Sequence, residues 1–180
     1  MVVFSPEEEE ITKGSPINRR NYFDKIFSIC SYSYLNELLS YNKILKQRNS
    51  LLRTEKNTIK KQKEIEIWNK PLIQKGFSLW SKRKAMMNEF ISFFIKTVNR
   101  FDKNLKLDIK YDLKSQNEEE YNIKLIEKTD SDIKKKHTSF GPHRDDVFFF
   151  WDQKQIKNHG SQGEHKLFLA LLKITEQLFL

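Results

Sequence analysis

The chain has 180 residues and a net charge of +9, with 38% apolar and 32% charged residues. Its 14 Phe, 6 Tyr and 3 Trp are enough to build a core, so the composition argues against a disordered protein. The low count of 5 Gly and 4 Pro argues against collagen-like and turn-rich all-β folds. No apolar run approaches the ~20 residues that span a bilayer. Cys30 has no second cysteine to pair with, so we expect a protein of the reducing cytoplasm that is neither exported nor membrane-inserted.

The positive charge is concentrated in the first part of the chain. Residues 1–100 hold 19 basic and 10 acidic residues, whereas residues 101–180 hold 14 of each. The stretch 43–84 alone holds 13 basic and 3 acidic residues. Such a surplus suits a surface that contacts a polyanion, and the alternative interpretation is a solvated helical face.

The first hundred residues favour helices. Residues 1–4 are a short β-prone run, and Ser5 with Pro6 then supplies a helix N-cap and a first-turn proline. Gly14 ends that helix, and a second begins after Ser15. A long amphipathic helix is predicted from apolar residues spaced by three, four and seven, namely Tyr34, Leu38, Tyr41, Leu45 and Leu52.

A return helix is predicted after a break. Residues 54–66 are charged and predict an exposed helical stretch or a turn, and Pro71 is expected to interrupt the helix. Residues 77–104 regain the helical period and are long enough to run antiparallel to the earlier helix. We therefore expect residues 5–104 to form a helical lobe.

The last eighty residues favour a mixed structure. Residues 105–111 alternate with period two, and residues 121–126 do so less cleanly, which predicts two strands joined by a polar link at 117–120. Residues 134–136 are expected to form a loop, and the run 147–151 to form a buried strand. A final helix is predicted after Gly160, with its apolar positions at Leu167, Ala170, Leu171, Ile174 and Leu178.

Two segments are candidate sites. Ser161-Gln162-Gly163-Glu164 begins the final helix, where free N–H groups and the helix dipole favour an anion, although Ser-x-x-Glu is also an ordinary capping box. The segment from Gly141 through His143, Arg144, Asp145 and Asp146 gathers titratable groups before a strand. The alternative is that its charges pair with one another.

Other chemistries find little support. All four histidines (His137, His143, His159 and His165) lie in the last quarter, but none has ligand-type spacing, so a metal-dependent hydrolase remains a minor alternative and no metal residues are assigned. The glycines at 14, 76, 141, 160 and 163 include no pair five apart, as a phosphate-binding loop requires. No nucleophile lies beside a recognisable base, so we assign no catalytic residue.

Four blocks of the sequence together resemble the RecF family of DNA replication and repair ATPases. They are Val2–Glu7 with Lys13–Pro16 and Arg19-Arg20; Leu45–Asn49 with Leu51-Leu52 and then Trp68; Thr138–Asp146; and Ser161–Gly163, which is similar to the family's ABC signature motif. Glu164 and His165 stand where the family usually has two Gln. In the family a phosphate-binding loop precedes the region of Met1 and an acidic strand follows that of Leu180, so the chain resembles the middle of a RecF protein.

The resemblance implies an α/β fold, namely a partial ABC-type ATPase head, P-loop NTPase-like, with an inserted helical arm. Residues 1–4 would be a head strand, residues 5–104 the arm, and residues 105–180 the head strands and signature helix. It further implies ATP and Mg²⁺ as cofactors and an ATP-dependent homodimer. The signature residues Ser161, Gln162, Gly163 and Glu164 would then contact ATP held by the other subunit, and His143, Arg144, Asp145 and Asp146 would be candidates for the nucleotide-dependent interface.

The function that this resemblance implies is an ATP-dependent DNA clamp. It would act at gapped, single-stranded or duplex DNA in recombinational repair and the SOS response, together with recombination mediator proteins. The candidate DNA contacts are the arm cations Lys43, Lys46, Arg48, Arg53, Lys60 and Lys61. This chain alone is expected not to hydrolyse ATP. The alternative is an ATP-independent basic helical module, which binds DNA or protein and is the product of a gene fragment.

Overall fold

The computed structural model describes residues 5–55, 58–115 and 117–180. These residues form two compact units that alternate along the chain. The sheet unit comprises Met1–Cys30, Lys84–Asp112 and Asp146–Leu180, and the hairpin unit comprises Ser31–Arg83 and Leu113–Asp145. The units therefore do not follow the expected consecutive division into 5–104 and 105–180. The reason is that one long helix, α4 (Thr58–Phe101), contributes residues to both.

The sheet unit contains a small antiparallel sheet. Its strands are β1 (Leu107–Asp112), β2 (Asp146–Trp151) and β3 (Lys154–Gln155), in the order β1-β2-β3. Its helices are α1 (Pro6–Lys13), α2 (Pro16–Cys30), α7 (Ile156–His159), α8 (Gln162–Phe179) and the C-terminal part of α4. The predicted strands at 105–111 and 147–151 are thus confirmed, with a register that pairs Ile109 with Phe149.

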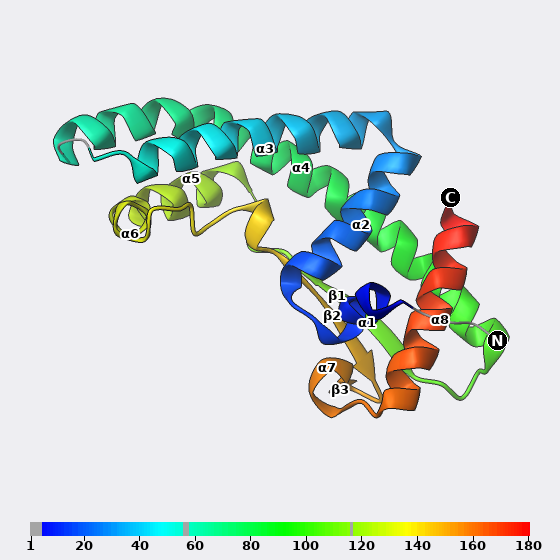
Figure 1. Cartoon of the computed structure of the whole chain (residues 1–180). Coiled ribbons are helices and arrows are strands. Elements are labelled where there is room, and N and C mark those ends of the chain that lie inside the picture. The colour runs from blue at the N-terminus through cyan, green and yellow to red at the C-terminus, as the bar shows by residue number, and fades with distance from the viewer. Residues whose placement is uncertain (1–4, 56–57, 116) are drawn as a thin grey trace. The chain divides into compact units, whose positions relative to one another are not determined.

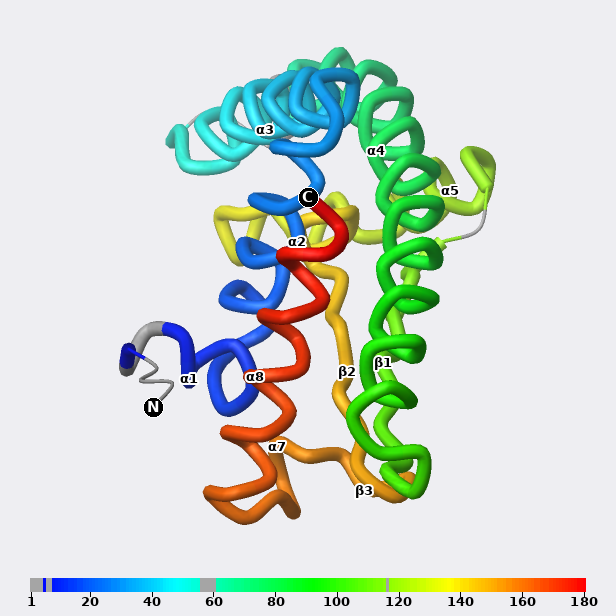
Figure 2. The backbone as a smooth tube through the Cα atoms, turned by 90° about the vertical axis from the view of Figure 1, so that its right-hand side faces the viewer, coloured from blue at the N-terminus to red at the C-terminus, as the bar shows by residue number. Residues whose placement is uncertain are grey.

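Aromatic side chains form the core of the sheet unit. Phe149 of β2 lies 5.0 Å from Phe168 of α8 and 6.4 Å from Phe23 of α2, measured between ring centroids. Phe168 in turn contacts Phe94 of α4 at 5.1 Å. Figure 2 shows α8 running alongside the sheet. The strand β2 was expected to be buried throughout, but Phe148 is only half-buried. The reason is that only one face of this sheet packs against helices, and Phe148 points to the other face.

The same capping chemistry begins the first and the last helix. In α1 the Ser5 hydroxyl accepts from the Glu8 N–H while the Glu8 carboxylate accepts from the Ser5 N–H, which is a capping box. Ser161 and Glu164 repeat the pattern at α8. Both predicted starts are confirmed, because a capping box satisfies backbone donors locally and needs no distant partner. Residues 1–4, expected to form a head strand, lie outside the described residues.

The hairpin unit contains two long helices and two short ones. Figure 1 shows α3 (Tyr32–Arg53) beside the N-terminal part of α4, with α5 (Glu118–Glu127) and α6 (Thr129–Lys135) along the same pair. A single 3-10 turn, η1 (Pro142–Arg144), ends the unit. Three contacts show that α3 and α4 are antiparallel: Tyr34 bonds Arg83, Arg48 bonds Asn69, and the Thr54 carbonyl accepts from Lys61.

Two expectations for this region were wrong. The helix continues through Pro71, although proline removes one backbone hydrogen bond, because the flanking Leu72 and Ile73 are buried in the core. Residues 121–126 are helix α5 and not a strand, because Asn117 caps the Glu120 N–H and three glutamates fill the first turn. The expected polar link at 117–120 is therefore a helix start, and the expected loop at 134–136 includes the end of α6.

The final helix buries a different face from the one expected. Of its predicted apolar positions, Leu171 is buried, whereas Ile174 and Leu178 are exposed. Phe168, Leu172 and other residues point to the core in their place. In the described part of the chain, no helix is both long enough and apolar enough to cross a membrane.

Candidate functional site

Asp145 is bonded to other residues of the hairpin unit. It is fully buried, and its Oδ2 accepts from Trp80 Nε1 at 2.6 Å and from Arg83 Nη1 at 3.1 Å. Arg83 also donates to the Pro142 carbonyl at 2.9 Å. A buried carboxylate needs such partners, because an unpaired charge in the interior is costly. The pair therefore fixes the end of the segment against α4.

Asp146 is likewise bonded to an arginine, within the sheet unit. Arg19 of α2 forms two parallel hydrogen bonds to it, from Nε to Oδ1 at 2.8 Å and from Nη2 to Oδ2 at 3.0 Å. This bidentate geometry is the strongest form of an Arg–carboxylate contact. The remaining Arg19 nitrogen, Nη1, donates to the Gly14 carbonyl at 2.9 Å. The two adjacent aspartates thus anchor two different units.

His143 has both ring nitrogens engaged within the hairpin unit. Its Nε2 lies 3.0 Å from the Thr138 carbonyl and its Nδ1 lies 2.6 Å from the Tyr41 hydroxyl. A carbonyl only accepts, so Nε2 carries the proton and Tyr41 donates to Nδ1. Burial raises the pKa of Tyr41 well above its ordinary value, which keeps the phenol protonated as this arrangement requires. His143 therefore has no lone pair left for a metal or a substrate proton.

Gly141 makes this close packing possible. Its φ of +136° is one that residues with side chains rarely adopt, and an added Cβ would lie 2.6 Å from the hydroxyls of both Tyr41 and Tyr121. Of the four interface candidates in this segment, only Arg144 is exposed, with Nη2 3.0 Å from the Thr138 carbonyl. His143, Asp145 and Asp146 are engaged, but not with one another as the alternative expected: their partners are Tyr41, Arg83 and Arg19, outside the segment.

The start of α8 is different, because it is open to solvent. Ser161, Gln162 and Gly163 are exposed. The Ser161 hydroxyl accepts from the Glu164 N–H at 3.3 Å, and the Glu164 carboxylate accepts from the Ser161 N–H at 2.6 Å. Hydrogen bonds from Ser161, the backbone one first, lower the pKa of Glu164. A carboxylate therefore occupies the place where the helix dipole favours an anion.

Gly163 has no structural need to be glycine. A Cβ added there meets no atom within 4 Å, and its φ does not lie in the left-handed region. A glycine in a helix costs about 1 kcal/mol relative to alanine, and no packing within the described chain compensates for that cost. Open space in front of a helix N-terminus is what a close approach by an external phosphate requires.

A small hollow of about 180 Å³ adjoins this helix start. It is lined by Trp151, Asp152, Lys154, Ile156, His159, Gly160 and Glu164. Asp152 and Gln153 both have positive φ, at 46° and 66°, and form the two-residue turn between β2 and β3.

His165 is buried beyond Glu164, and its Nδ1 lies 2.9 Å from the Thr12 hydroxyl. Burial, and then the charge of Lys13, lowers the pKa of His165.

The predicted DNA contacts divide into three groups. Lys43, Lys46 and Arg53 are exposed, and their spacing of three and seven residues places them on one face of α3. Arg48 is fully buried, where Nη1 bonds Asp132 at 2.8 Å and Thr138 at 2.7 Å, so it is not available to DNA. Lys61 is also buried, with Nζ 2.7 Å from the Thr54 carbonyl. The side chain of Lys60 lies outside the described residues.

Sequence reasoning missed the partners of these buried charges. Asp132 was part of no motif, and it is 84 residues from Arg48. Arg19 was noted as part of a block, but nothing local indicated its pairing with Asp146, 127 residues away. Among the described residues, no three His, Cys, Asp or Glu side chains gather in a way that could hold a metal ion.

Comparison with known proteins relates the chain to one class. No protein-family model matches it. Its fold matches part of an ABC-type ATPase with a helical arm, in agreement with the expected α/β fold class. Two solved structures cover 99% and 97% of the chain, with TM-scores of 0.85 and 0.84 and 29% identity.

The particular relatives are the RecF proteins. Both solved structures are described as the recombination mediator protein RecF in the RecFOR pathway, one with ATPrS and one with ATP. The chain is 34% identical over 175 residues to the DNA replication and repair protein RecF of Leptospira interrogans, and 35% identical over 179 residues to that of Lachnoclostridium phytofermentans. The alignments cover 96% and 98% of this chain but 47% and 49% of those proteins. The expected resemblance to RecF is confirmed, and the chain spans about half the length of these relatives.

Proposed function

We propose that the chain forms the arm and the signature part of a RecF-like DNA replication and repair protein. In this proposal the α8 start closes on the phosphates of ATP bound by a second subunit, and the arm contacts DNA. The observation that carries the proposal is the unexplained Gly163, exposed at the start of an 18-residue helix, in a chain related to proteins solved with ATP and ATPrS.

The phosphate contact uses groups that α8 already presents. The N–H groups of the first turn have no partners within a helix, and the dipole adds positive potential in front of them. The Ser161 hydroxyl adds a donor, because a hydroxyl that accepts from the Glu164 N–H can still donate its own proton. Gly163 lets the phosphate approach the backbone. Gln162, which is also exposed, lies between Ser161 and Gly163. The Glu164 carboxylate must swing aside, because it now accepts from the Ser161 N–H.

The DNA contact uses the exposed face of α3. Lys43 and Arg53 are ten residues apart, about 15 Å along a helix, and Lys46 lies between them. The exposed residues of this helix include no acid, because its one carboxylate, Glu37, is half-buried and pairs with Lys75. An array of this kind binds a phosphate backbone without reading sequence. Gapped, single-stranded and duplex DNA are therefore all candidate ligands, and mediator proteins and the SOS response belong to the same proposal by relationship to RecF.

ATP hydrolysis is not assigned to this chain. No glycine pair has the spacing of a phosphate-binding loop, and the described residues gather no carboxylate group for Mg²⁺. The nucleotide and its metal would be held by the partner subunit, while this chain supplies the signature. We expect the purified chain to show no ATP turnover above that of a Ser161→Arg variant.

The test measures nucleotide-dependent DNA binding with a complete partner. The chain is mixed with the RecF of L. interrogans, with and without ATP, and the anisotropy of a fluorescein-labelled gapped duplex is recorded. We expect ATP to tighten binding by the mixture beyond that of either protein alone. Gly163→Val should abolish this gain because the new side chain blocks the phosphate, and Gln177→Val, at an exposed position near the other end of α8, should leave it intact.

Two results would count against the clamp. If ATP has no effect on the mixture, and Gly163→Val and Gln177→Val behave alike, the phosphate contact is excluded. If the chain alone binds DNA with a steep salt dependence and no response to ATP, the basic helical module is the better description. Removing three α3 cations together (Lys43→Gln, Lys46→Gln and Arg53→Gln) should lower the salt slope by about 2 to 3 in either case. A matched set of exposed lysines in the sheet unit (Lys103→Gln, Lys106→Gln and Lys157→Gln) should leave the slope unchanged.

A further inference from the structure

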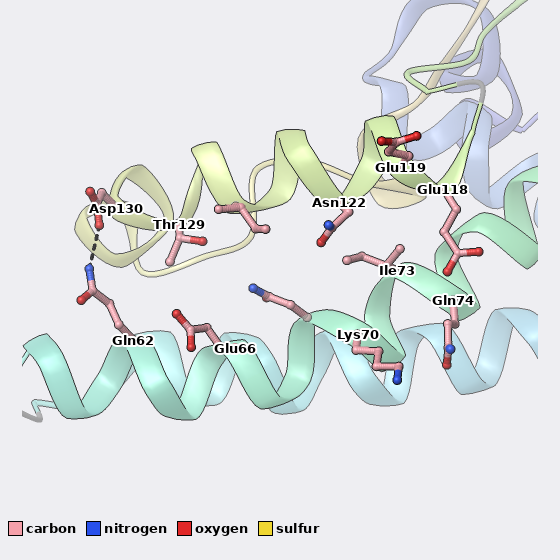
Figure 3. Close-up of a pocket in the computed structure, with 12 residues that line it drawn as sticks. Gln62, Glu66, Lys70, Ile73, Gln74, Glu118, Glu119, Asn122, Thr129 and Asp130 are labelled. Carbon is pink, nitrogen blue, oxygen red and sulfur yellow. Dashed lines mark hydrogen bonds between the residues drawn. The ribbon is translucent and has the colours of Figure 1, made fainter.

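The hairpin unit has a groove that the proposed function does not use. It lies between α4 on one side and α5 with α6 on the other, and its volume is about 900 Å³ (Figure 3). The α4 residues that line it extend from Gln62 to Gln74, twelve positions or about 18 Å of helix. At one end Gln62 Nε2 donates to Asp130 Oδ1 at 3.0 Å and so links the two walls.

The charge of this groove is opposite to that of the α3 face. Its described lining residues include four acids, Glu66, Glu118, Glu119 and Asp130, and one cation, Lys70. Glu66, Glu118 and Glu119 are exposed, and no cation of the described residues pairs with them. Figure 3 shows Glu66 on the α4 side and Glu118 on the α5 side of the gap. This potential repels a nucleic acid and attracts a basic ligand.

The floor of the groove is apolar and presents one hydrogen-bond donor that has no partner among the described residues. Ile73 is buried in the floor, and Ile126 is 56% exposed on the α5 side. Asn69 lines the groove with 6% of its surface exposed, and its Oδ1 accepts from Arg48 Nε at 3.0 Å. No described residue accepts a hydrogen bond from the other end of this amide, Asn69 Nδ2. This Nδ2 is reachable from the groove, so a ligand carbonyl can accept from it in place of water.

The free Asn69 donor favours an extended peptide over a helix. An extended chain rises about 3.3 Å per residue, so five or six residues span the groove. Only an extended chain offers the free backbone carbonyl that Asn69 Nδ2 lacks, because the carbonyls of a helix interior are already bonded.

We propose that this groove binds an extended, basic segment of a partner protein, five or six residues long. Lys or Arg side chains of the segment pair with Glu66 and Glu118, an apolar side chain contacts Ile73 and Ile126, and a backbone carbonyl accepts from Asn69 Nδ2. The proposal needs no nucleotide and no DNA, so it stands or fails independently of the clamp.

The probe is a fluorescein-labelled hexapeptide of sequence Lys-Leu-Lys-Lys-Leu-Lys, titrated with the 180-residue chain. A hexapeptide with Glu in place of every Lys is the charge control. We expect the basic peptide to bind and the acidic one not to bind. The double variant Glu66→Gln/Glu118→Gln should weaken binding at least fivefold. Its control, Glu89→Gln/Glu127→Gln, removes two exposed carboxylates that do not line the groove and should leave binding unchanged.

A matched pair of isoleucines tests the apolar contact. Ile126 lines the groove and Ile123 does not, although both belong to α5 and have similar exposed fractions of 56% and 50%. Ile126→Ser should weaken peptide binding several-fold, and Ile123→Ser should not. Circular dichroism checks that all variants keep their helix content.

The proposal is overturned if the basic peptide does not bind, if the acidic peptide binds as well, or if the two serine variants behave alike. Competition by a six-residue oligothymidylate would assign the groove to nucleic acid. Concentration-dependent self-association that Glu66→Gln/Glu118→Gln abolishes would assign it to a second copy of this chain. Sedimentation of the free chain separates this last outcome from an external partner.

Discussion

The segment Gly141–Asp146 and the α8 start at Ser161–Glu164 are both rich in motif residues, but they use them in opposite ways. In the first, Asp145 and Asp146 are buried, and each is held by an arginine of its own unit. In the second, the Ser161 hydroxyl and the Glu164 carboxylate each accept from the other residue's backbone N–H across one helical turn, and the surface in front of them is open. A high density of titratable groups therefore indicates a structural joint as readily as a site. The feature that distinguishes the two is whether the groups are buried against partners elsewhere in the fold or lie open to solvent.

The largest expected effect comes from uncoupling the buried Asp145 from its partners. Asp145→Asn removes the charge that compensates Arg83 while keeping an acceptor for Trp80. An uncompensated buried charge costs about 3 kcal/mol or more, so we expect the free energy of unfolding to fall by that amount. Urea denaturation measures the change, and Glu127→Gln, which removes an exposed carboxylate of the same unit, is the control. A loss no larger than that of the control would contradict the buried pairing.

The two glycines give the sharpest form of the comparison. Gly141→Ala forces a side chain into a left-handed position and against two tyrosine hydroxyls, so we expect a loss of about 1 to 3 kcal/mol. Gly163→Ala adds a methyl group in open space at a helical position, so we expect a gain of about 0.4 to 1 kcal/mol. Urea denaturation measures both changes in the free energy of unfolding, provided that its dependence on urea concentration is the same in all variants. Changes of the same sign would mean that the two glycines are held by similar constraints and that the contrast fails.

His165 makes the stability of the chain depend on pH. His165 is buried beside Lys13, and burial lowers its pKa, while Glu164 and Glu9 act in the opposite direction. The unfolded chain therefore binds more protons than the folded one as pH falls through about 6.5, the ordinary histidine value. The stabilising contribution of the neutral imidazole is complete above that pH and is lost below it. We expect the free energy of unfolding to decrease from pH 7 to pH 5, and His165→Asn to make the decrease shallower. An unchanged slope in that variant would exclude His165 as its source.

How much the sequence predicts depends on how local each signal is. The starts of α1 and α8 follow from residues three positions apart, and the strand β1 follows from an alternation over seven residues; the structure confirms all three. Helix α5 was missed although its signal was equally local, because Asn117 followed by three glutamates was interpreted as a link and not as a cap.

The pairings of the buried charges lie beyond such reasoning. Arg48 belongs to a basic stretch and has the spacing of a surface residue, yet it is the fully buried centre of contacts with Asn69, Asp132 and Thr138. Only tertiary contacts across 21 to 90 residues determine that outcome. The same holds for Asp145 and Asp146, whose sequence shows two carboxylates but not the two arginines that neutralise them.

The smallest effect concerns the carboxylate at the α8 start. Glu164→Gln keeps an oxygen to accept from the Ser161 N–H but removes the negative charge from the place where a phosphate would bind. The lowered pKa of Glu164 means that this charge is present at neutral pH, so its removal relieves repulsion from a phosphate. We therefore expect a several-fold increase in ATP-dependent association with the RecF of L. interrogans, measured by sedimentation, and almost no change in stability.

The control for this variant is Glu89→Gln, which alters an exposed carboxylate of the sheet unit and should have no effect. Glu176→Gln is not a suitable control, because Glu176 pairs with Lys173 within that unit. Equal association in Glu164→Gln and the unaltered chain would mean that Glu164 already swings clear without cost, or that no phosphate approaches the helix. Gly163→Val decides between these two, because it blocks the approach in the first case and changes nothing in the second.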